Sequence, residues 1–194
     1  MAALYIDPRG PYPKLAGVDC WDEARDARNY PGPFPVVAHP PCGRWCRLAG
    51  MVEARYGYRK GDDGGCFAAA LASVRRMGGV LEHPAWSDAW PAHGLPRPTT
   101  FGWQRSLFSR EWVCEVSQCA YGHRGQKLTW LLYVGDTPPR SPDWSRPAWR
   151  GVVSGARNRC GRPLTERIWG DEAKRTPPTF AEFLVSLARS SVAA

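Results

Sequence analysis

Two short apolar segments that each end in a chemically reactive residue constrain the fold of this chain most strongly. Residues 34–38 predict a buried strand, and two successive prolines then stop it and stiffen the turn that presents Cys42. Residues 65–77 have apolar side chains at helical spacing, and the next apolar segment, 80–82, predicts a strand that ends at Glu82. Because ligands of open α/β sheets bind outside the carboxyl ends of strands, we expect Cys42 and Glu82 to lie near each other.

The other apolar segments extend this α/β pattern. Residues 3–6 predict a short buried strand that ends at Asp7, where a carboxylate is well placed for a site. Residues 19–29 are charged and favour a solvated surface helix. Segments 112–117 and 128–134 predict an antiparallel pair of strands on either side of a loop.

The length of the chain indicates one domain. Its 194 residues can bury a single core, so we expect one α/β domain over 1–194 without an independent second module. Residues 136–175 include a long stretch rich in Pro, Ser, Arg and Gly and predict an extended or mobile segment. Residues 176–191 have one apolar face and predict a C-terminal helix that packs on the core.

Charge and cysteine content restrict the class of partner and the compartment. The net charge of +8 and the excess of arginine over lysine favour an anionic partner such as nucleic acid, although a merely basic protein is the plain alternative. Seven cysteines, an odd number, without a basic-then-apolar leader argue against a secreted disulfide scaffold. No apolar run approaches the length of a membrane span. We therefore expect a cytoplasmic protein without a membrane partner.

The residues at the two strand ends suggest nucleophilic chemistry on a pyrimidine. A thiolate at Cys42 could attack an electron-poor ring carbon if nearby cations stabilise it, and His39, Arg44 and Arg47 could supply that charge. Attack at C6 pushes charge into the ring, which a carboxylic acid at N3, here Glu82, would offset. The alternatives are a small buried Cys and a Glu that serves only as a cap or ion-pair partner.

Histidine, cysteine and tryptophan side chains are further candidates for site residues. All four histidines lie in or beside these motifs, and His39 and His123 are the favoured pair. The ligand-type residues around Cys42 lack both paired Cys-x-x-Cys spacing and the His-x-Glu and Pro-Cys-x-x-Cys motifs of zinc deaminases, so no metal site is expected. Half or more of the tryptophans should lie in the core. Four of them could stack on bases: Trp45, Trp86, Trp90 and Trp103.

The order of these motifs resembles that of the cytosine C5 DNA methyltransferases and their short phage-type relatives. The Pro-Pro-Cys turn of that family matches residues 40–42, and Glu82 matches the Glu of its Glu-Asn-Val segment, where His83 and Pro84 replace the last two residues. A Tyr-Gly segment ahead of a strand matches residues 121–134. The similarity covers roughly 34–135, and its specificity rests on the order and spacing of the motifs together.

The resemblance implies a transferase acting on a cytosine that is single-stranded or flipped out of DNA. It implies Cys42 as covalent nucleophile, Glu82 as the group at N3, and Lys127 or Arg124 as base or phosphate contact. We predict four catalytic residues, Cys42, Glu82, His39 and Lys127. We predict further substrate contacts at Pro41, Arg44, Trp45, His83, Gln118, Tyr121, His123 and Arg124.

Two departures from the family qualify this interpretation. The family binds S-adenosylmethionine at a Phe-x-Gly-x-Gly turn after its first strand, whereas this chain has no such turn and offers only Asp7 as a cofactor contact. Residues 136–162 are too few for a separate target-recognition domain, so a protein partner would supply specificity or the cofactor half. The predicted fold is an abbreviated Rossmann-like sheet with flanking helices, in a bacterial or phage-infected cell.

Three hypotheses follow from the sequence. The first is a DNA-modifying enzyme similar to a minimal cytosine C5 methyltransferase. The second keeps the nucleophilic cysteine but modifies C5 of a pyrimidine, in DNA or in a nucleotide, without S-adenosylmethionine. The third is a non-catalytic, phage-type nucleic-acid-binding protein that retains the base pocket.

Overall fold

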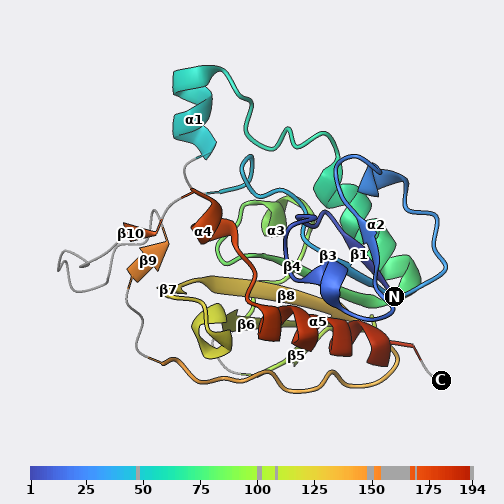
Figure 1. Cartoon of the computed structure of the whole chain (residues 1–194). Helices are drawn as coiled ribbons and strands as arrows, with labels where there is room; N and C mark the ends of the chain where they lie inside the picture. The colour runs from blue at the N-terminus through green and yellow to red at the C-terminus, as the bar shows by residue number, and fades with distance from the viewer. Residues whose placement is uncertain are drawn as a thin grey trace.

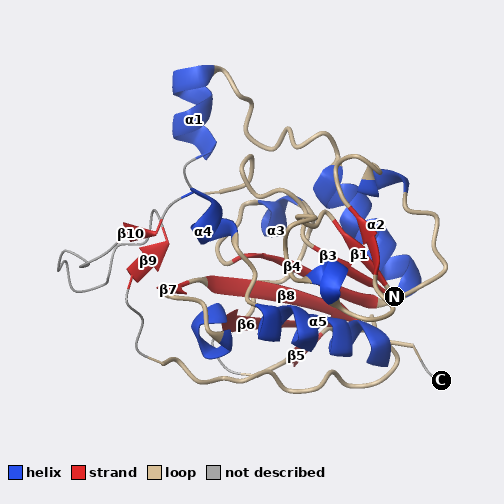
Figure 2. Ribbon diagram, in the orientation of Figure 1, coloured by secondary structure: helices blue, strands red, loops and turns tan. Residues whose placement is uncertain are grey.

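The fold is α/β, built on a mixed seven-stranded sheet. A computed structural model describes residues 1–46, 49–99, 102–107, 109–147, 151–153, 167–168 and 170–192. The strand order is β2-β1-β3-β4-β8-β6-β5 (Figure 2). Strands β2, β1, β3 and β4 are mutually parallel, and β8 runs antiparallel to both of its neighbours. The bounds are β1 Ala2–Leu4, β2 Asp19–Trp21, β3 Val36–Ala38, β4 Gly79–Pro84, β5 Gln104–Arg105, β6 Glu111–Ser117 and β8 Leu128–Val134.

The parallel strands reverse their order around β1. The chain places β2 on one side of β1 and then returns to place β3 on the other side, followed by β4. The register pairs Leu4 with Ala38 and Ala38 with Leu81. The carboxyl ends of β1 and β3 and the middle of β4 are therefore neighbours, and ligands of open α/β sheets bind at such a reversal.

Helices cover both faces of the sheet, which makes three layers (Figure 1). Helix α2, Cys66–Met77, buries Phe67 and Val74 in a cluster with Val36, Ala38 and Leu81 of the sheet. Helix α5, Pro178–Ser190, packs on the opposite face in the cluster that contains Val37 and Val80. Because side chains alternate along a strand, the residues next to these positions can be assigned to one layer or the other.

Smaller elements surround this core. Helix α1, Ala49–Tyr56, projects away from the sheet in Figure 1, whereas α3, Ala89–Ala92, and α4, Gly170–Lys174, are single short turns. A second, three-stranded parallel sheet has the order β10-β9-β7. Its strands are β7 Gly125–Gln126, β9 Gly151–Val153 and β10 Arg167–Ile168.

Most of the predicted elements are confirmed. The structure contains the strands around 36–38 and 79–84, the helix between them, and the C-terminal helix. The predicted antiparallel pair is β6 and β8, which pair along their whole length. The first strand is shorter than predicted, because Tyr5 adopts a left-handed backbone conformation with φ 59° and ends it before Asp7.

One prediction about the segments is wrong. Residues 19–29 form no α-helix, because Asp19–Trp21 pair with β1 as the edge strand β2 and only a 3-10 turn follows at Ala27–Asn29. In the segment 136–175, predicted to be extended or mobile, the described residues include strands β9 and β10 and the short helix α4. Residues 148–150, 154–166 and 169 of that segment lie outside the described part of the chain. Within that part, no helix has the length and apolar character needed to span a membrane.

Candidate active site

The centre of the candidate site is a contact between His39 and Glu82. His39 follows β3 directly, and Glu82 lies in the neighbouring strand β4. Strand alternation directs both side chains to the α5 face of the sheet, as it does Val37 and Val80. His39 Nδ1 lies 2.8 Å from Glu82 Oε2, and both side chains are largely buried. The two predicted residues are therefore brought together at the carboxyl ends of adjacent parallel strands.

Three further side chains complete what we call the Glu82 network: Tyr12, Gln118 and Thr129. Gln118 Nε2 donates to Glu82 Oε1 at 3.1 Å and to Thr129 Oγ1 at 2.8 Å. Thr129 belongs to β8, the antiparallel neighbour of β4, and is fully buried. On the other side, the Tyr12 hydroxyl lies 2.6 Å from His39 Nε2. Both oxygens of the Glu82 carboxylate thus have a hydrogen-bonding partner.

These contacts decide the charge of Glu82. Burial by itself would raise the pKa of the Glu82 carboxyl, but the hydrogen bond and charge of His39, with smaller effects of Lys127 and His83, hold it well below its ordinary range. Glu82 is therefore a carboxylate at neutral pH. Because a carboxylate only accepts hydrogen bonds, His39 Nδ1 must carry the proton in the contact with Glu82.

Cys42 lies close enough to Glu82 for their charges to interact. Burial raises the pKa of the Cys42 thiol, the negative charge of Glu82 raises it further, and Lys127 lowers it. Arginines near Cys42 were predicted to stabilise its thiolate, and the Arg44 guanidinium lies 4.2 Å from the centre of the Tyr58 ring in this structure. Arg47 lies outside the described residues. Among the described residues, Lys127 is a cation that favours the thiolate.

Lys127 connects the site to the segment that precedes α5. Its ammonium donates to the backbone carbonyls of Lys174 and Arg175, at 3.1 and 3.0 Å. Burial lowers the pKa of Lys127, while the charges of Glu82 and Cys42 oppose that shift. Lys127 therefore places a positive charge beside both predicted reactive groups.

His83 lies on the opposite face of the sheet from Glu82. Its ring packs edge-on against Phe67 of α2, with ring centroids 5.1 Å apart. Burial lowers the pKa of His83 to about 4, although the charge of Glu82 and the backbone of Pro41 favour the charged form. Neither ring nitrogen has a partner of full hydrogen-bond geometry among the described residues. His83 is therefore a neutral imidazole next to the turn that carries Pro41 and Cys42.

Three residues predicted to contact substrate, Tyr121, His123 and Arg124, make contacts within the protein instead. Tyr121 packs against Phe180 and Phe183 of α5, and its hydroxyl accepts a hydrogen bond from the backbone of Asp143. His123 Nε2 lies 3.3 Å from the backbone carbonyl of Glu172, whose carboxylate pairs with Arg124 at 3.0 Å. In this structure these side chains bind the 121–124 loop to α4 and α5.

The remaining predicted residues are spread over several surroundings. The Trp45 indole donates to Asp63 at 2.8 Å, and Trp90 is buried in the core. Trp86 is 48% exposed, with Arg97 5.5 Å from its ring centre. Asp7 lies beyond the end of β1, exposed, and pairs with Arg9. Of these residues, Trp86 has the exposure that stacking on a base requires.

Tyr12 is the member of the network that the sequence did not predict. It lies in a Pro-rich loop that forms a 3-10 turn, Tyr12–Lys14, where neither helical nor strand periodicity is present. Its proximity to His39 depends on the pairing of β1 with β3, which brings the loop after β1 to the end of β3. Thr129 was predicted only as part of a strand. Glu82 pairs with Leu131 of β8, and Thr129 is two residues from Leu131, so strand alternation places Thr129 on the same face and could have identified it.

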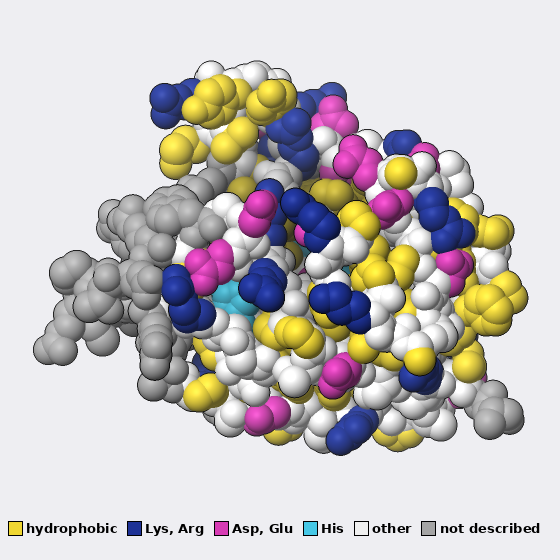
Figure 3. All heavy atoms as spheres, viewed as in Figure 1, with side chains coloured by type: hydrophobic (Ala, Val, Ile, Leu, Met, Phe, Trp, Pro, Cys, Tyr) yellow, Lys and Arg dark blue, Asp and Glu magenta, His cyan; other side chains and the backbone are white. Residues whose placement is uncertain are grey.

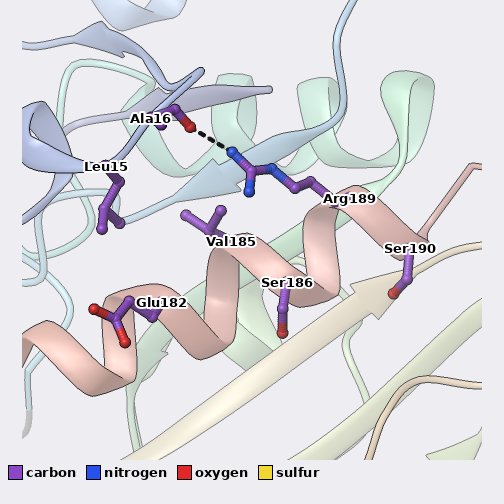
Figure 4. A pocket seen from close by; sticks show the side chains of 7 residues that line it. All are labelled: Leu15, Ala16, Glu182, Val185, Ser186, Arg189 and Ser190. Atoms are coloured by element: carbon purple, nitrogen blue, oxygen red, sulfur yellow. Dashed lines mark hydrogen bonds between the residues drawn. The ribbon is translucent and has the colours of Figure 1, made fainter.

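The surface of the described residues carries charges of both signs. Figure 3 shows Lys and Arg side chains spread over the face viewed, with Asp and Glu side chains between them. A separate pocket lies between α5 and the loop at Leu15 and Ala16, where Arg189 donates to the Ala16 carbonyl at 2.5 Å (Figure 4). No member of the Glu82 network lines that pocket.

The donor groups of the described residues favour covalent and acid-base chemistry. The six cysteines in this part of the chain are free, and no three His, Cys, Asp or Glu side chains there are grouped to hold a metal ion. The arrangement can instead bring a thiol, a carboxylate with its histidine, and an ammonium to one bound group. Comparisons with protein families, with curated proteins and with solved structures give no match for this chain.

Proposed function

We propose that this protein modifies a pyrimidine base of DNA, with Cys42 as nucleophile at C6 and Glu82 as the group at N3. The observation that carries the proposal is the proximity of Cys42 to a buried, ionised Glu82 held by His39 and Gln118. A carboxylate in such a network is fixed in direction, as binding the edge of a base requires. Lys127 provides a compensating positive charge beside both groups.

The chemistry of cytosine gives each residue a defined step. The Cys42 thiolate forms a bond to C6, and the displaced ring electrons collect at N3, which takes a proton from the Glu82 side. C5 then has enamine character and can bond to an electrophile. Loss of the C5 hydrogen as a proton, with return of the N3 proton to the Glu82 side, restores the C5–C6 double bond and releases Cys42 as thiolate.

Base binding can also activate the thiol. In the free protein the charge of Glu82 raises the pKa of Cys42. A base whose exocyclic amino group donates to Glu82 partly neutralises that charge, while Lys127 continues to favour the thiolate. The reactive form of Cys42 is then produced when its target is present, and the resting thiol is protected from other electrophiles.

The sheet supports a Rossmann-like interpretation of the fold. The reversal of strand order at β1 and β3 matches the switch point at which doubly wound sheets bind ligands. The residues after β1 do not fit S-adenosylmethionine, because the turn lacks a glycine-rich loop and Asp7 pairs with Arg9. The function that this site supports best is therefore modification of C5 of the pyrimidine with a donor other than S-adenosylmethionine.

A non-catalytic nucleic-acid-binding role is the second candidate. Exposed aromatic rings with arginine beside them occur at Tyr56 with Arg55 and at Tyr58 with Arg44, around the projecting helix α1. Such pairs can stack on bases and contact phosphates without any reaction. The net charge of +8 favours the same partner.

Mass spectrometry of nucleosides tests the proposed function. DNA from cells that express the protein is digested and compared with DNA from cells that express the Cys42→Ala or Cys46→Ala variant. We expect a new pyrimidine mass with the wild type and with Cys46→Ala, and none with Cys42→Ala. The mass difference identifies the transferred group. A new mass that persists in Cys42→Ala would contradict the assignment of the nucleophile, and retained DNA binding with no new mass would favour the binding role.

A further inference from the structure

The contact between Tyr12 and His39 has no role in the steps described so far. Tyr12 is 2% exposed and reaches His39 across 27 residues of sequence. Its hydroxyl lies 2.6 Å from Nε2, and the two rings are tilted with centroids 5.3 Å apart. Burial and the charge of Glu82 raise the pKa of Tyr12 well above its ordinary value, so the hydroxyl keeps its proton. A buried tyrosine in this position can act only through its hydrogen bond to His39.

A hydroxyl is the one type of partner that satisfies Nε2 in both charge states of the imidazole. When His39 is neutral and its proton is on Nδ1, Nε2 is an acceptor and the Tyr12 hydroxyl donates to it. When His39 is an imidazolium, Nε2 carries a proton and the Tyr12 oxygen accepts it. His39 can therefore gain or lose a proton inside the protein without leaving a buried polar atom unpaired.

We propose that Tyr12 is a positioning residue of a proton relay, Tyr12–His39–Glu82, that delivers one proton to N3 of the bound pyrimidine; this inference rests on the proposed function. In the relay, the Nδ1 proton of the His39 imidazolium moves to Glu82, and the Glu82 acid gives a proton to N3 as Cys42 adds to C6. His39 is left neutral with its remaining proton on Nε2, donated to Tyr12. When Cys42 leaves C6, the N3 proton returns through Glu82 to Nδ1 of His39, which restores the imidazolium beside the Glu82 carboxylate and closes the proton balance.

The charged groups around the relay interact with Glu82 and Tyr12. The positive charge of Lys127 stabilises the Glu82 carboxylate to which the relay returns. The charge of Cys42 interacts with that of Glu82, and the charge of Cys20 with that of Tyr12. Gln118 holds the second carboxylate oxygen and cannot supply the proton, because an amide does not titrate. Among these groups His39 is the ionisable side chain in hydrogen-bond contact with Glu82.

The test is the Tyr12→Phe variant, which keeps the buried ring and removes the hydroxyl. Two properties are measured: the pH midpoint of the His39 imidazole by NMR, and the rate at which the C5 hydrogen of cytosine in an oligonucleotide exchanges with solvent. Exchange reports addition of Cys42 to C6 without any group donor. Tyr133→Phe is the matched control, since Tyr133 is buried in the same layer and its hydroxyl donates to the Ser190 carbonyl.

We expect the His39 midpoint to be lower in Tyr12→Phe, because the imidazolium loses the stronger, charge-assisted hydrogen bond. The exchange rate of Tyr12→Phe should equal that of wild type at acid pH and fall below it, by about tenfold per unit of midpoint shift, as the pH rises. Tyr133→Phe should match wild type in both properties. A deficit that is the same at every pH would mean that Tyr12 has a packing role and would overturn the relay.

The outcomes separate the relay from the proposed function. Exchange by wild type, with the same pH profile in Tyr12→Phe, would overturn the relay alone, whether or not the His39 midpoint moves. No exchange by wild type at any pH would overturn the proposed function and the chemical role of the relay together. A lower midpoint with a deficit that grows with pH supports both.

Discussion

The charge of Glu82 raises the pKa of the Cys42 thiol, whereas a site that holds a stable thiolate would lower it. An ionised carboxylate beside the thiol disfavours the thiolate, and Lys127 only partly offsets it. The resting protein therefore holds Cys42 as a thiol and Glu82 as a carboxylate. This charge state is consistent with a nucleophile that is formed only when a base engages Glu82.

Alkylation of Cys42 measures this coupling without any substrate. The Glu82→Gln variant removes the negative charge, so the pKa of Cys42 should fall and its alkylation by iodoacetamide near neutral pH should accelerate, by up to about tenfold for one pKa unit. Lys127→Gln should slow the same reaction. Mass spectrometry of the peptide that contains Cys42 gives the rate. The control is Glu115→Gln, a buried glutamate of β6 that contacts Trp130 and Arg146. Slower alkylation in Glu82→Gln would contradict the account.

Sequence reasoning found part of this site at the residue scale. His39, Cys42 and Glu82 could be predicted because each follows or ends an apolar strand, and strand ends are where ligand sites form. The contact of Arg44 with Tyr58 could not be predicted, because proximity in sequence does not determine which ring a long side chain packs against. Tyr12 could not be predicted, since its contact with His39 arises from tertiary pairing of β1 with β3.

At the scale of elements, the pairing of β3 with β4 determines where the site forms. Val36 pairs with Gly79, and the register continues to Ala38 opposite Leu81. Gly79 begins β4 with φ 119°, and a Cβ atom there would collide with the backbone of Val36. Only glycine allows this close approach of the two strands. The distance between the ends of β3 and β4, and so the His39–Glu82 contact, depends on it.

Substitution of Gly79 by Ala should destabilise the protein by at least about 2 kcal/mol, because a backbone collision adds to the cost of the positive φ. Gly94→Ala is the matched control, since Gly94 also has a positive φ, 68°, but has open space around it. That variant should lose about 1 kcal/mol. Urea unfolding gives both values. Equal losses in the two variants would show that the strands can separate without cost.

The elements that sequence predicted correctly are those with a clear apolar period. Helix α2 has such a period and ends before Gly78, whose positive φ of 77° favours glycine. The segment 19–29 was predicted wrongly because its charged residues suit a surface helix, whereas tertiary pairing with β1 makes Asp19–Trp21 a strand. A strand of three residues is too short to show an alternating pattern, so the charged composition that favours a helix dominated the prediction.

At the scale of the whole molecule, the candidate site lies at one end of the sheet. The carboxyl ends of β1 and β3, together with the end of β4, carry the Glu82 network, and Lys127 attaches the segment after α4 to the same end. Loops cover that end of the sheet, and helix α1 projects from the body of the molecule (Figure 1). Arginine and tyrosine side chains pair at and near this helix. The sheet fixes the positions of the groups in the candidate site, and the net charge of +8 favours the anionic partner that we propose.

Exchange of the C5 hydrogen of cytosine tests the central claim most directly, because it requires addition of Cys42 to C6 and no donor, cofactor or product. Oligonucleotides in single-stranded and duplex form are incubated in deuterium oxide with wild type, Cys42→Ala or Glu82→Gln, and deuterium at C5 is measured by mass spectrometry. The account predicts exchange with wild type, fastest on the single strand because no base pair must open, and none above background with Cys42→Ala or Glu82→Gln. Wild-type exchange no faster than that of Cys42→Ala on either substrate would contradict it.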